Sequence, residues 1–212
     1  MAHTKIENTL QKIKDAFILL VNEKSFSNIN VSDITRAAKI NRGTFYLHYQ
    51  DKYDLLERLE NTILDKLQEI LKKGIEKTIP RKDEISELFT YSLALETARL
   101  LYAEKNIVCV LFKDYSTFDF ILKIKKIFIK MLLNALKEAK GNLAFKADIP
   151  QKYAEEIVFN NVISVYRFWI AEDQPETPEE IADIITKSRY ISPFEILDIN
   201  NTLVIESRGN LT

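Results

Sequence analysis

Apolar side chains recur at steps of three and four residues along most of the chain, which is the spacing of amphipathic α-helices. The first such run consists of Ile6, Leu10, Ile13, Phe17, Leu20 and Val21. The pattern predicts helices at about 5–24, 31–38, 42–48, 52–77, 83–103, 106–113, 117–140, 151–172 and 178–189. Gly74 and Pro80 are predicted to end the helix at 52–77. We therefore expect an all-α fold of about nine helices, with no prediction for the tail after Ser192.

The composition is that of a packed protein without a membrane segment. Hydrophobic residues make up 46% of the 212 positions and charged residues 29%, enough apolar side chains for a core. No stretch approaches the roughly 18–20 uncharged apolar residues of a membrane span, and the first residues lack an apolar signal core. Cys109 is the single cysteine, which excludes an intrachain disulfide. We expect a cytoplasmic protein that does not bind membranes.

Charge is distributed unevenly along the chain. Residues 1–52 carry eight basic and five acidic side chains, whereas the remaining residues carry 22 basic and 26 acidic ones. A basic N-terminal segment on an acidic body suits a polyanionic partner. We predict a boundary at this point, with one domain at 1–52 and a second at 53–212.

Residues 30–49 have the order of a helix-turn-helix. Asn30 can cap a first short helix, and Asp33 lies where the helix dipole favours a carboxylate. Small side chains at Ala37 and Ala38 would let a second helix approach closely. Lys39 then falls in the turn, and a second capping residue, Asn41, follows it.

The second short helix, at 42–48, carries a costly glycine. Gly43 in a helix costs about 0.5–1 kcal/mol relative to alanine, which makes sense where a backbone must pass close to a phosphate. Polar and aromatic side chains gather on one flank, at Arg42, Thr44, Tyr46 and His48, while Phe45 and Tyr49 can hold the opposite flank to the core. Such side chains at a helix N-terminus read base edges in the major groove. The sequence therefore predicts a double-stranded DNA operator as partner.

Asp51 is predicted to cap the following long helix, which places Lys52 in its first turn. A lysine there opposes the helix dipole, so we interpret Lys52 as the ligand of an anion.

Residues 29–56, with the core Ile-Asn-Arg-Gly-Thr-Phe-Tyr-Leu-His-Tyr-Gln-Asp-Lys-Tyr-Asp-Leu-Leu at 40–56, resemble the DNA-binding head of the tetracycline-repressor (TetR) family. The resemblance implies a three-helix N-terminal helix-turn-helix domain and a helical C-terminal dimerisation and ligand-binding domain. It also implies a homodimeric transcription regulator, usually a repressor, released from a pseudo-palindromic operator by an effector. Trp169 and the Pro-Glu-Glu-Ile segment at 178–181 further resemble the C-terminal body of Gram-positive, Firmicutes-type members.

By motif position, the resemblance places Arg42, Thr44 and Tyr46 against bases and Thr35, His48, Tyr49 and Lys52 against phosphates. The full set of predicted DNA-binding residues is Thr35, Arg36, Asn41, Arg42, Gly43, Thr44, Tyr46, His48, Tyr49 and Lys52. One position departs from the family, which usually has glycine in the turn where this chain has Lys39. A left-handed lysine would cost about 1–2 kcal/mol.

The segment at 151–172 is apolar nearly all round, so more than one of its sides should be buried. The next segment opens with Thr177 and Glu180 at capping-box spacing. Two such helices from each of two chains would form a four-helix dimer bundle, although the same helices could also be the core of a monomer. The predicted interface residues are Ile157, Asn161, Val165, Phe168, Ile181, Ile184 and Ile185.

Large apolar and aromatic residues are frequent at 89–133. They fit either an ordinary helical core or a cavity for a hydrophobic small-molecule effector. The candidate ligand residues are Tyr91, Arg99, Tyr102, Phe112 and Phe128. The alternative is that a protein partner, and not a small molecule, controls DNA binding by this regulator.

Enzyme chemistry finds little support in the sequence. The chain has two histidines, His3 and His48, and we find no phosphate-binding glycine loop, nucleophile elbow or metal-ligand spacing in it. We predict that the protein is not an enzyme and uses no cofactor or metal.

Overall fold

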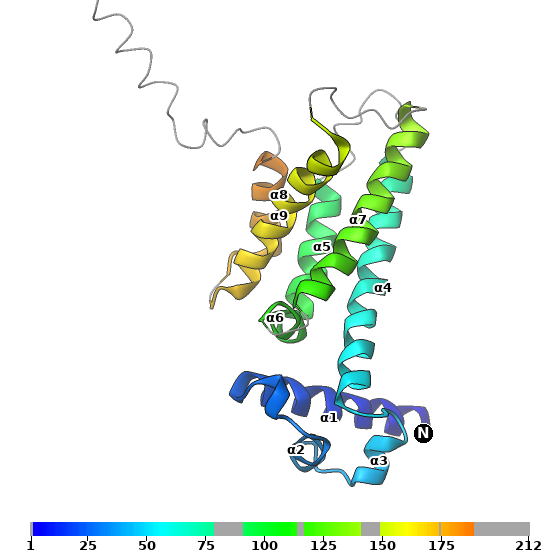
Figure 1. The fold of residues 1–212 in the computed structure, drawn as a ribbon, viewed down its shortest axis with the longest axis vertical. Coiled ribbons are helices and arrows are strands. Elements are labelled where there is room, and N and C mark those ends of the chain that lie inside the picture. The colour runs from blue at the N-terminus through cyan, green and yellow to red at the C-terminus, as the bar shows by residue number, and fades with distance from the viewer. Residues whose placement is uncertain (1, 79–90, 114–116, 141–148, 174, 189–212) are drawn as a thin grey trace, which may run out of the picture.

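The computed structural model describes residues 2–78, 91–113, 117–140, 149–173 and 175–188, and these residues form an all-helical protein (Figure 1). The helices are α1 (Ala2–Glu23), η1 (Phe26–Asn28), α2 (Val31–Ala37), α3 (Arg42–Tyr46), α4 (Lys52–Thr78), α5 (Tyr91–Ala103), α6 (Lys105–Lys113), α7 (Thr117–Lys140), α8 (Gln151–Ala171) and α9 (Pro178–Ser188). The all-α prediction is confirmed. The predicted segment 83–90 and the tail after Ser192 lie outside the described residues.

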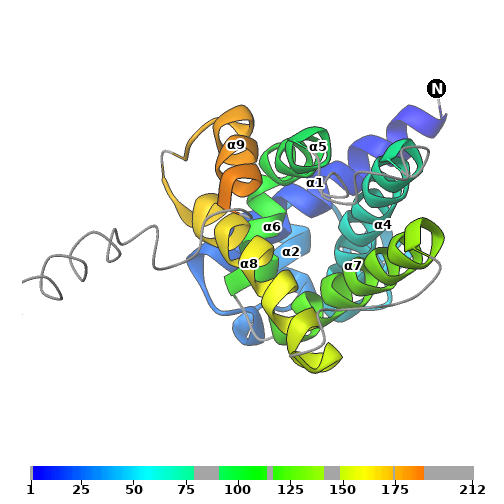
Figure 2. The ribbon, with the colours of Figure 1, turned by 90° about the horizontal axis from the view of Figure 1, so that it is seen from above.

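Helices α1, α2 and α3 form one end of the molecule, here called the head, and α4 to α9 form the body (Figure 1). Helix α4 leaves the head after α3 and runs the length of the body beside α7 and α5. Seen from above, α8 and α9 lie at one edge of the body, and α4 and α7 lie at the other (Figure 2). One apolar core runs from Phe17 and Phe45 in the head to Phe159 and Trp169 in the body.

Helix starts follow the capping residues read from the sequence. The Asn30 side chain accepts a hydrogen bond from the Asp33 backbone N–H at 3.1 Å, and the Asp33 carboxylate accepts one from the Asn30 backbone N–H at 3.2 Å. Thr177 and Glu180 form the same reciprocal pair at the start of α9. Each pair satisfies backbone donors that a helix N-terminus leaves without partners.

The predicted helix at 52–77 corresponds to α4, which continues past Gly74 to Thr78. A Cβ atom built at Gly74 would lie 2.8 Å from a methyl carbon of Leu93. Glycine at this position therefore serves the close approach of α4 to α5, and the packing gained there offsets its cost inside a helix.

The head and the body are joined by an ion-pair cluster at the start of α6. Glu104 lies 2.7 Å from the Lys14 ammonium in α1 and 2.6 Å from the Lys66 ammonium in α4. Burial alone would raise the pKa of Glu104, but hydrogen bonds from the two lysines outweigh it and hold the pKa below its usual range. The carboxylate thus stays charged and links the head to two elements of the body.

Candidate nucleic-acid interface and internal cavity

Helices α2 and α3 are connected by a tight turn at Lys39. Lys39 has a φ of 55°, in the left-handed region, and the Ile40 N–H donates to the Thr35 carbonyl at 3.0 Å. Asn41 then caps α3 by accepting hydrogen bonds from the Thr44 backbone N–H at 2.7 Å and the Thr44 hydroxyl at 2.8 Å. The predicted helix-turn-helix geometry is present, with the lysine strained as expected.

Replacing Lys39 by glycine is expected to raise the free energy of unfolding by about 1 kcal/mol, because a left-handed conformation costs a side-chain-bearing residue about that much. Urea unfolding of the variant followed by circular dichroism measures the change. Lys39→Ala is the matched control, since it removes the same charge and keeps the strain. Equal stabilisation by both variants would contradict the strain argument.

The outer face of α3 presents a polar surface to solvent. Arg42, Tyr46 and the capping residue Asn41 are exposed there, with Tyr46 at 55% of its full exposure, and Arg36 is exposed on α2. The Arg42 guanidinium donates to the Ser32 hydroxyl of α2, which ties the two helices together on this side. Thr44 and His48 are half-buried at the edge of the face. Most of the predicted DNA-binding residues are thus exposed or half-buried on α2, α3 and the turn between them.

Among the described residues, none accounts for the glycine in α3. A Cβ atom built at Gly43 would meet only the Asn41 side-chain oxygen, at the ordinary contact distance of 3.4 Å. An alanine would therefore fit and would favour the helix. A requirement for glycine at this exposed position must come from something that approaches the surface from outside.

Two predicted phosphate ligands are buried. Thr35 is 5% exposed, and its hydroxyl donates to the Ser32 carbonyl within α2. The Tyr49 ring packs 5.5 Å from the Phe45 ring, and burial raises the pKa of its hydroxyl. Because both side chains face the core of the head, neither is placed to hold a phosphate in this conformation.

Lys52 has an internal role that the sequence does not reveal. Its ammonium donates to the backbone carbonyls of Phe26 at 2.8 Å, Ser27 at 3.0 Å and Ile29 at 2.7 Å. It also lies 4.6 Å from the centre of the Phe26 ring. All three ammonium donors therefore have partners at the end of η1. The interpretation that only a bound anion explains a lysine at this helix start is wrong. The three carbonyl oxygens carry partial negative charge and stabilise the ammonium group within the protein.

Leu47 is a surface residue that sequence reasoning missed. It directly follows α3 and is 81% exposed, the highest value among the exposed large hydrophobic residues described. An apolar side chain at this place can contact the methyl group of thymine in a major groove. The sequence did contain a sign of this exposure. Phe45 and Tyr49 already fill the flank of the helix that faces the core, so Leu47 between them had to point elsewhere.

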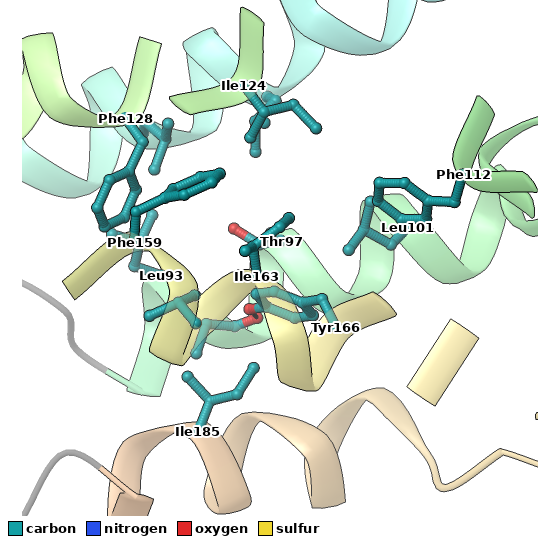
Figure 3. Close-up of a pocket in the computed structure, with 14 residues that line it drawn as sticks. Leu93, Thr97, Leu101, Phe112, Ile124, Phe128, Phe159, Ile163, Tyr166 and Ile185 are labelled. Atoms are coloured by element: carbon teal, nitrogen blue, oxygen red, sulfur yellow. Dashed lines mark hydrogen bonds between the residues drawn. The ribbon is translucent and has the colours of Figure 1, made fainter. Parts of the chain in front are cut away.

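The body contains an apolar cavity of about 70 Å³ lined by residues of α4, α5, α6, α7, α8 and α9. Phe112 and Phe128, two of the predicted ligand residues, line it. Its other lining residues are Leu67, Leu71, Leu93, Ala94, Thr97, Leu101, Ile124, Phe159, Val162, Ile163, Tyr166 and Ile185. Figure 3 shows Thr97 and Tyr166 close together among these aliphatic and aromatic side chains.

The other three predicted ligand residues do not reach this cavity. Tyr91 and Tyr102 are exposed on α5, and Arg99 forms ion pairs at the surface with Glu96 and with Glu179 of α9. These residues occupy the outward face of α5, since the helix turns Leu93, Thr97 and Leu101 inward instead. The cavity therefore gives no support to the prediction for these three positions.

Hydrogen-bonding groups in the cavity are few. The Tyr166 hydroxyl donates to the Ala94 carbonyl at 2.8 Å, and burial raises the pKa of Tyr166 strongly, so the hydroxyl stays protonated. Thr97 is also buried beside it. A molecule that enters the cavity therefore contacts an apolar surface whose polar groups are the neighbouring hydroxyls of Thr97 and Tyr166.

Helix α8 carries an apolar stripe on its outer face. Ile157 is 59% exposed and Phe168 71% exposed, with Asn161 and half-buried Val165 between them at helical spacing. Ile184 of α9 is also exposed. Ile181 and Ile185 are buried within the chain's own core, so their assignment to a dimer interface is corrected: α9 turns them toward α5 and the cavity.

Within the described residues, no helix is long and apolar enough to cross a membrane, and no group of histidine, cysteine and acidic side chains is arranged to hold a metal ion.

Two family models match the chain. Residues 15–59 match the model for bacterial regulatory proteins of the tetR family, and residues 90–189 match the model for a transcriptional regulator C-terminal region of the same family. Together the matches span about two thirds of the chain. The first covers the second part of α1, all of α2 and α3 and the beginning of α4, and the second covers α5 to α9.

Relatives and solved structures agree with these matches. An uncharacterised helix-turn-helix transcriptional regulator of Bacillus subtilis, YxbF, is 21% identical over 87% of this chain, which spans just under half (46%) of that relative's length. The fatty acid metabolism regulator protein of Bacillus subtilis is 22% identical, over 77% of this chain and 84% of the relative. The crystal structure of the transcriptional regulator FadR from Bacillus subtilis in complex with stearoyl-CoA is similar in fold. Its TM-score is 0.55 at 20% identity, over 84% of this chain and 95% of that one.

Proposed function

We propose that this chain, which belongs to the tetR family of bacterial regulatory proteins and is a DNA-binding transcriptional regulator, acts as a homodimeric repressor at a pseudo-palindromic operator. The observation that carries the proposal is the exposed face of α3. It presents Arg42, Tyr46 and Leu47 around a glycine that no contact among the described residues requires. In this proposal residues 1–52 read DNA and residues 53–212 dimerise and receive a signal.

Selection of random duplex DNA by the purified full-length protein, at two salt concentrations, tests the reader. The expected result is a pseudo-palindrome whose half-sites are about 34–36 Å apart or somewhat more, because a two-fold dimer places two recognition helices on one side of the duplex. Tyr46→Ala should lose the enrichment, whereas Tyr91→Ala, an exposed tyrosine of α5, should keep it. Failure to enrich any sequence at either salt would contradict the proposal.

Gly43→Ala is expected to change stability and DNA binding in opposite directions. Alanine should stabilise the free protein by about 0.5–1 kcal/mol, since it favours the helix and its Cβ atom meets no close contact. The same Cβ atom should obstruct the approach of a DNA backbone and lower operator affinity about tenfold or more. Thermal unfolding without DNA and fluorescence anisotropy with labelled operator measure the two effects. Unchanged affinity would remove Gly43 from the interface.

The dimer is proposed to form through the outer face of α8. Phe168 and Ile157 are large apolar side chains left open to solvent by the chain's own packing, and Ile184 of α9 adds to them. Burial of such a stripe against a second copy would remove apolar surface from water and build a four-helix bundle.

Phe168→Glu is expected to weaken dimerisation at least a hundredfold, because it would bury a carboxylate in the centre of that bundle. Analytical ultracentrifugation over a concentration series measures the dissociation constant. Tyr91→Glu places the same charge on an exposed aromatic position of α5 and should leave the dimer intact. If Phe168→Glu dimerised like the wild type, the interface would lie elsewhere.

The effector is proposed to be a mainly apolar small molecule that enlarges the cavity among α4, α5, α7 and α8. The lining is apolar apart from Thr97 and Tyr166, and the present volume of about 70 Å³ lies well below the about 300–1,000 Å³ of ligand sites. Binding must therefore displace the walls, including Leu67 and Leu71 of α4. Since α4 begins directly after the head, its displacement would change the placement of α3.

A long-chain acyl thioester is the first candidate for this effector. The Bacillus subtilis regulator FadR, of similar fold, was crystallised with stearoyl-CoA, and an acyl chain matches the aliphatic and aromatic lining. Addition of stearoyl-CoA to the complex of this protein with its selected operator should release the DNA, because an effector acts only through different affinities for the two states. Unchanged operator affinity at saturating stearoyl-CoA would exclude this ligand.

A further inference from the structure

A second hollow lies on α7, on the side of the helix turned away from the internal cavity. It is an open groove of about 500 Å³, lined chiefly by Leu122, Lys125, Lys126, Ile129, Lys130 and Leu133. The cavity instead takes Ile124 and Phe128 from α7. Helix α7 lies at the edge of the body across from α9 (Figure 2). We call this hollow the α7 groove.

The floor of the α7 groove is apolar. A helix face that contacts only water usually carries polar side chains instead. Ile129 is buried at the base of the groove, and half-buried Leu122 and Leu133 lie two turns before it and one turn after it. The three residues follow helical spacing, so their side chains share one face of α7. An apolar floor of this kind favours a ligand that carries a hydrocarbon group.

Two lysines at the groove lack acidic partners among the described residues. Lys126 and Lys130 are exposed, and neither forms an ion pair with a described side chain. Neighbouring lysines of α7 are engaged: Lys125 pairs with Glu156 of α8, and Lys123 lies 3.1 Å from Glu60 of α4. The groove therefore keeps two ammonium groups available for a ligand.

The spacing of Lys126 and Lys130 carries an electrostatic cost. Residues four apart lie on the same side of a helix with Cβ atoms about 5–6 Å apart, and like charges there destabilise the helix by a few tenths of a kcal/mol. A dianion placed between the two ammonium groups would replace this repulsion with two charge-assisted hydrogen bonds. A phosphate monoester carries about −1.5 to −2 charges at neutral pH and fits this requirement.

We propose that the α7 groove binds an amphipathic phosphate monoester, with the phosphate held by Lys126 and Lys130 and a short hydrocarbon group on Ile129. The groove volume of about 500 Å³ falls in the range of small-molecule sites. Glu155 of α8, which accepts a hydrogen bond from Gln151, also lines the groove, and its carboxylate would repel a phosphate, so the phosphate is expected at the two lysines. This site is separate from DNA binding and from the internal cavity, and the proposal stands without either.

Hexyl phosphate is the probe for this site. It is titrated into the full-length protein carrying ¹³C-labelled methyl groups on isoleucine and leucine, and NMR shifts report its position. The expected result is saturable shifts of the Ile129, Leu122 and Leu133 methyl groups. Hexanol, which lacks the charge, and inorganic phosphate, which lacks the chain, should each bind at least tenfold more weakly.

Lys126→Gln/Lys130→Gln should weaken hexyl phosphate binding at least tenfold. The matched control is Lys137→Gln/Lys152→Gln, which removes the same number of exposed charges from α7 and α8 outside the groove lining and should bind like the wild type. Equal weakening in both pairs, or shifts confined to the cavity residues Ile124 and Ile163, would overturn the proposal. Binding of an acidic amphipathic peptide at the groove without binding of hexyl phosphate would also overturn it and indicate a protein-docking surface.

Discussion

Lys52→Met is expected to lower the free energy of unfolding by about 2–4 kcal/mol and to weaken DNA binding on every sequence. The Lys52 ammonium donates to the carbonyls of Phe26, Ser27 and Ile29 at 2.7–3.0 Å. A hydrogen bond to a charged group contributes about 1.5–3 kcal/mol, and partly buried acceptors left without donors add to the loss. Methionine keeps the length and apolar stem of the side chain, so the change isolates the ammonium group.

The loss is expected to reach the DNA because η1 joins α1 to α2. Without the Lys52 ammonium, the carbonyls at η1 lose their partner and the start of α2 is held less firmly. Because α3 packs on α2, the position of α3 would change as well. Urea unfolding gives the stability, and operator affinity at several salt concentrations gives the charge contribution. If Lys52 served only to hold a DNA phosphate, its replacement would behave differently. The free energy of unfolding would stay unchanged, and the slope of log affinity against log salt concentration would fall by about one unit. That pattern would refute the internal role.

Lys52→Arg separates geometry from charge in this experiment. Arginine keeps the positive charge, but its planar fork cannot direct three N–H groups at three converging carbonyls. We expect it to recover part of the stability lost in Lys52→Met. Full recovery would show that the positive charge alone, 4.6 Å from the centre of the Phe26 ring, accounts for the stabilisation by Lys52.

Trp169→Ala is expected to cost about 3–5 kcal/mol, the range for truncating a buried aromatic residue. Trp169 is fully buried, and its ring stacks 6.1 Å from the Tyr102 ring and lies 6.4 Å from the Tyr166 ring. Its indole N–H donates to the Glu176 carbonyl at 2.7 Å, which holds the segment leading into α9. Alanine would therefore leave a cavity between α5 and α8 and release the start of α9.

Urea unfolding of Trp169→Ala must be followed by circular dichroism, because Trp169 is the only tryptophan in the chain. Trp169→Phe is the matched control: it keeps an aromatic ring and loses the N–H, so about 1–2 kcal/mol should be lost. A loss below about 1 kcal/mol in the alanine variant would mean that the surrounding helices collapse into the space. The argument that this residue anchors α9 would then fail.

Local features of the fold were predictable because they depend on neighbours within one helical turn. The predicted helix at 151–172 corresponds to α8 at Gln151–Ala171, and the one at 178–189 to α9 at Pro178–Ser188. The caps at Asn30, Asn41 and Thr177 were equally readable, since a capping side chain and its backbone partner lie three residues apart. The short helix η1 left no periodic signal and was missed.

Helix faces were less predictable than helix positions. The segment 151–172 is apolar nearly all round, so periodicity could not say that Phe168 points outward while Trp169 points inward. In α5 the aromatic residues Tyr91 and Tyr102 suggested a ligand site, yet the helix turns Thr97 and Leu101 to the cavity. Aromatic content indicates apolar surface but not its direction, which is set by the helices packed around it.

The sequence alone determined the all-α fold, the helix-turn-helix at residues 30–49 and the family, because caps, periodicity and a local motif are all encoded within short stretches of chain. The tertiary structure decided the roles of single side chains that meet distant residues. Lys52 finds its carbonyl partners more than 20 positions earlier, and Glu104 finds Lys14 in α1 90 positions away. Such contacts form only when whole helices pack, since the spacing of residues along one helix fixes its face but not the element that covers it.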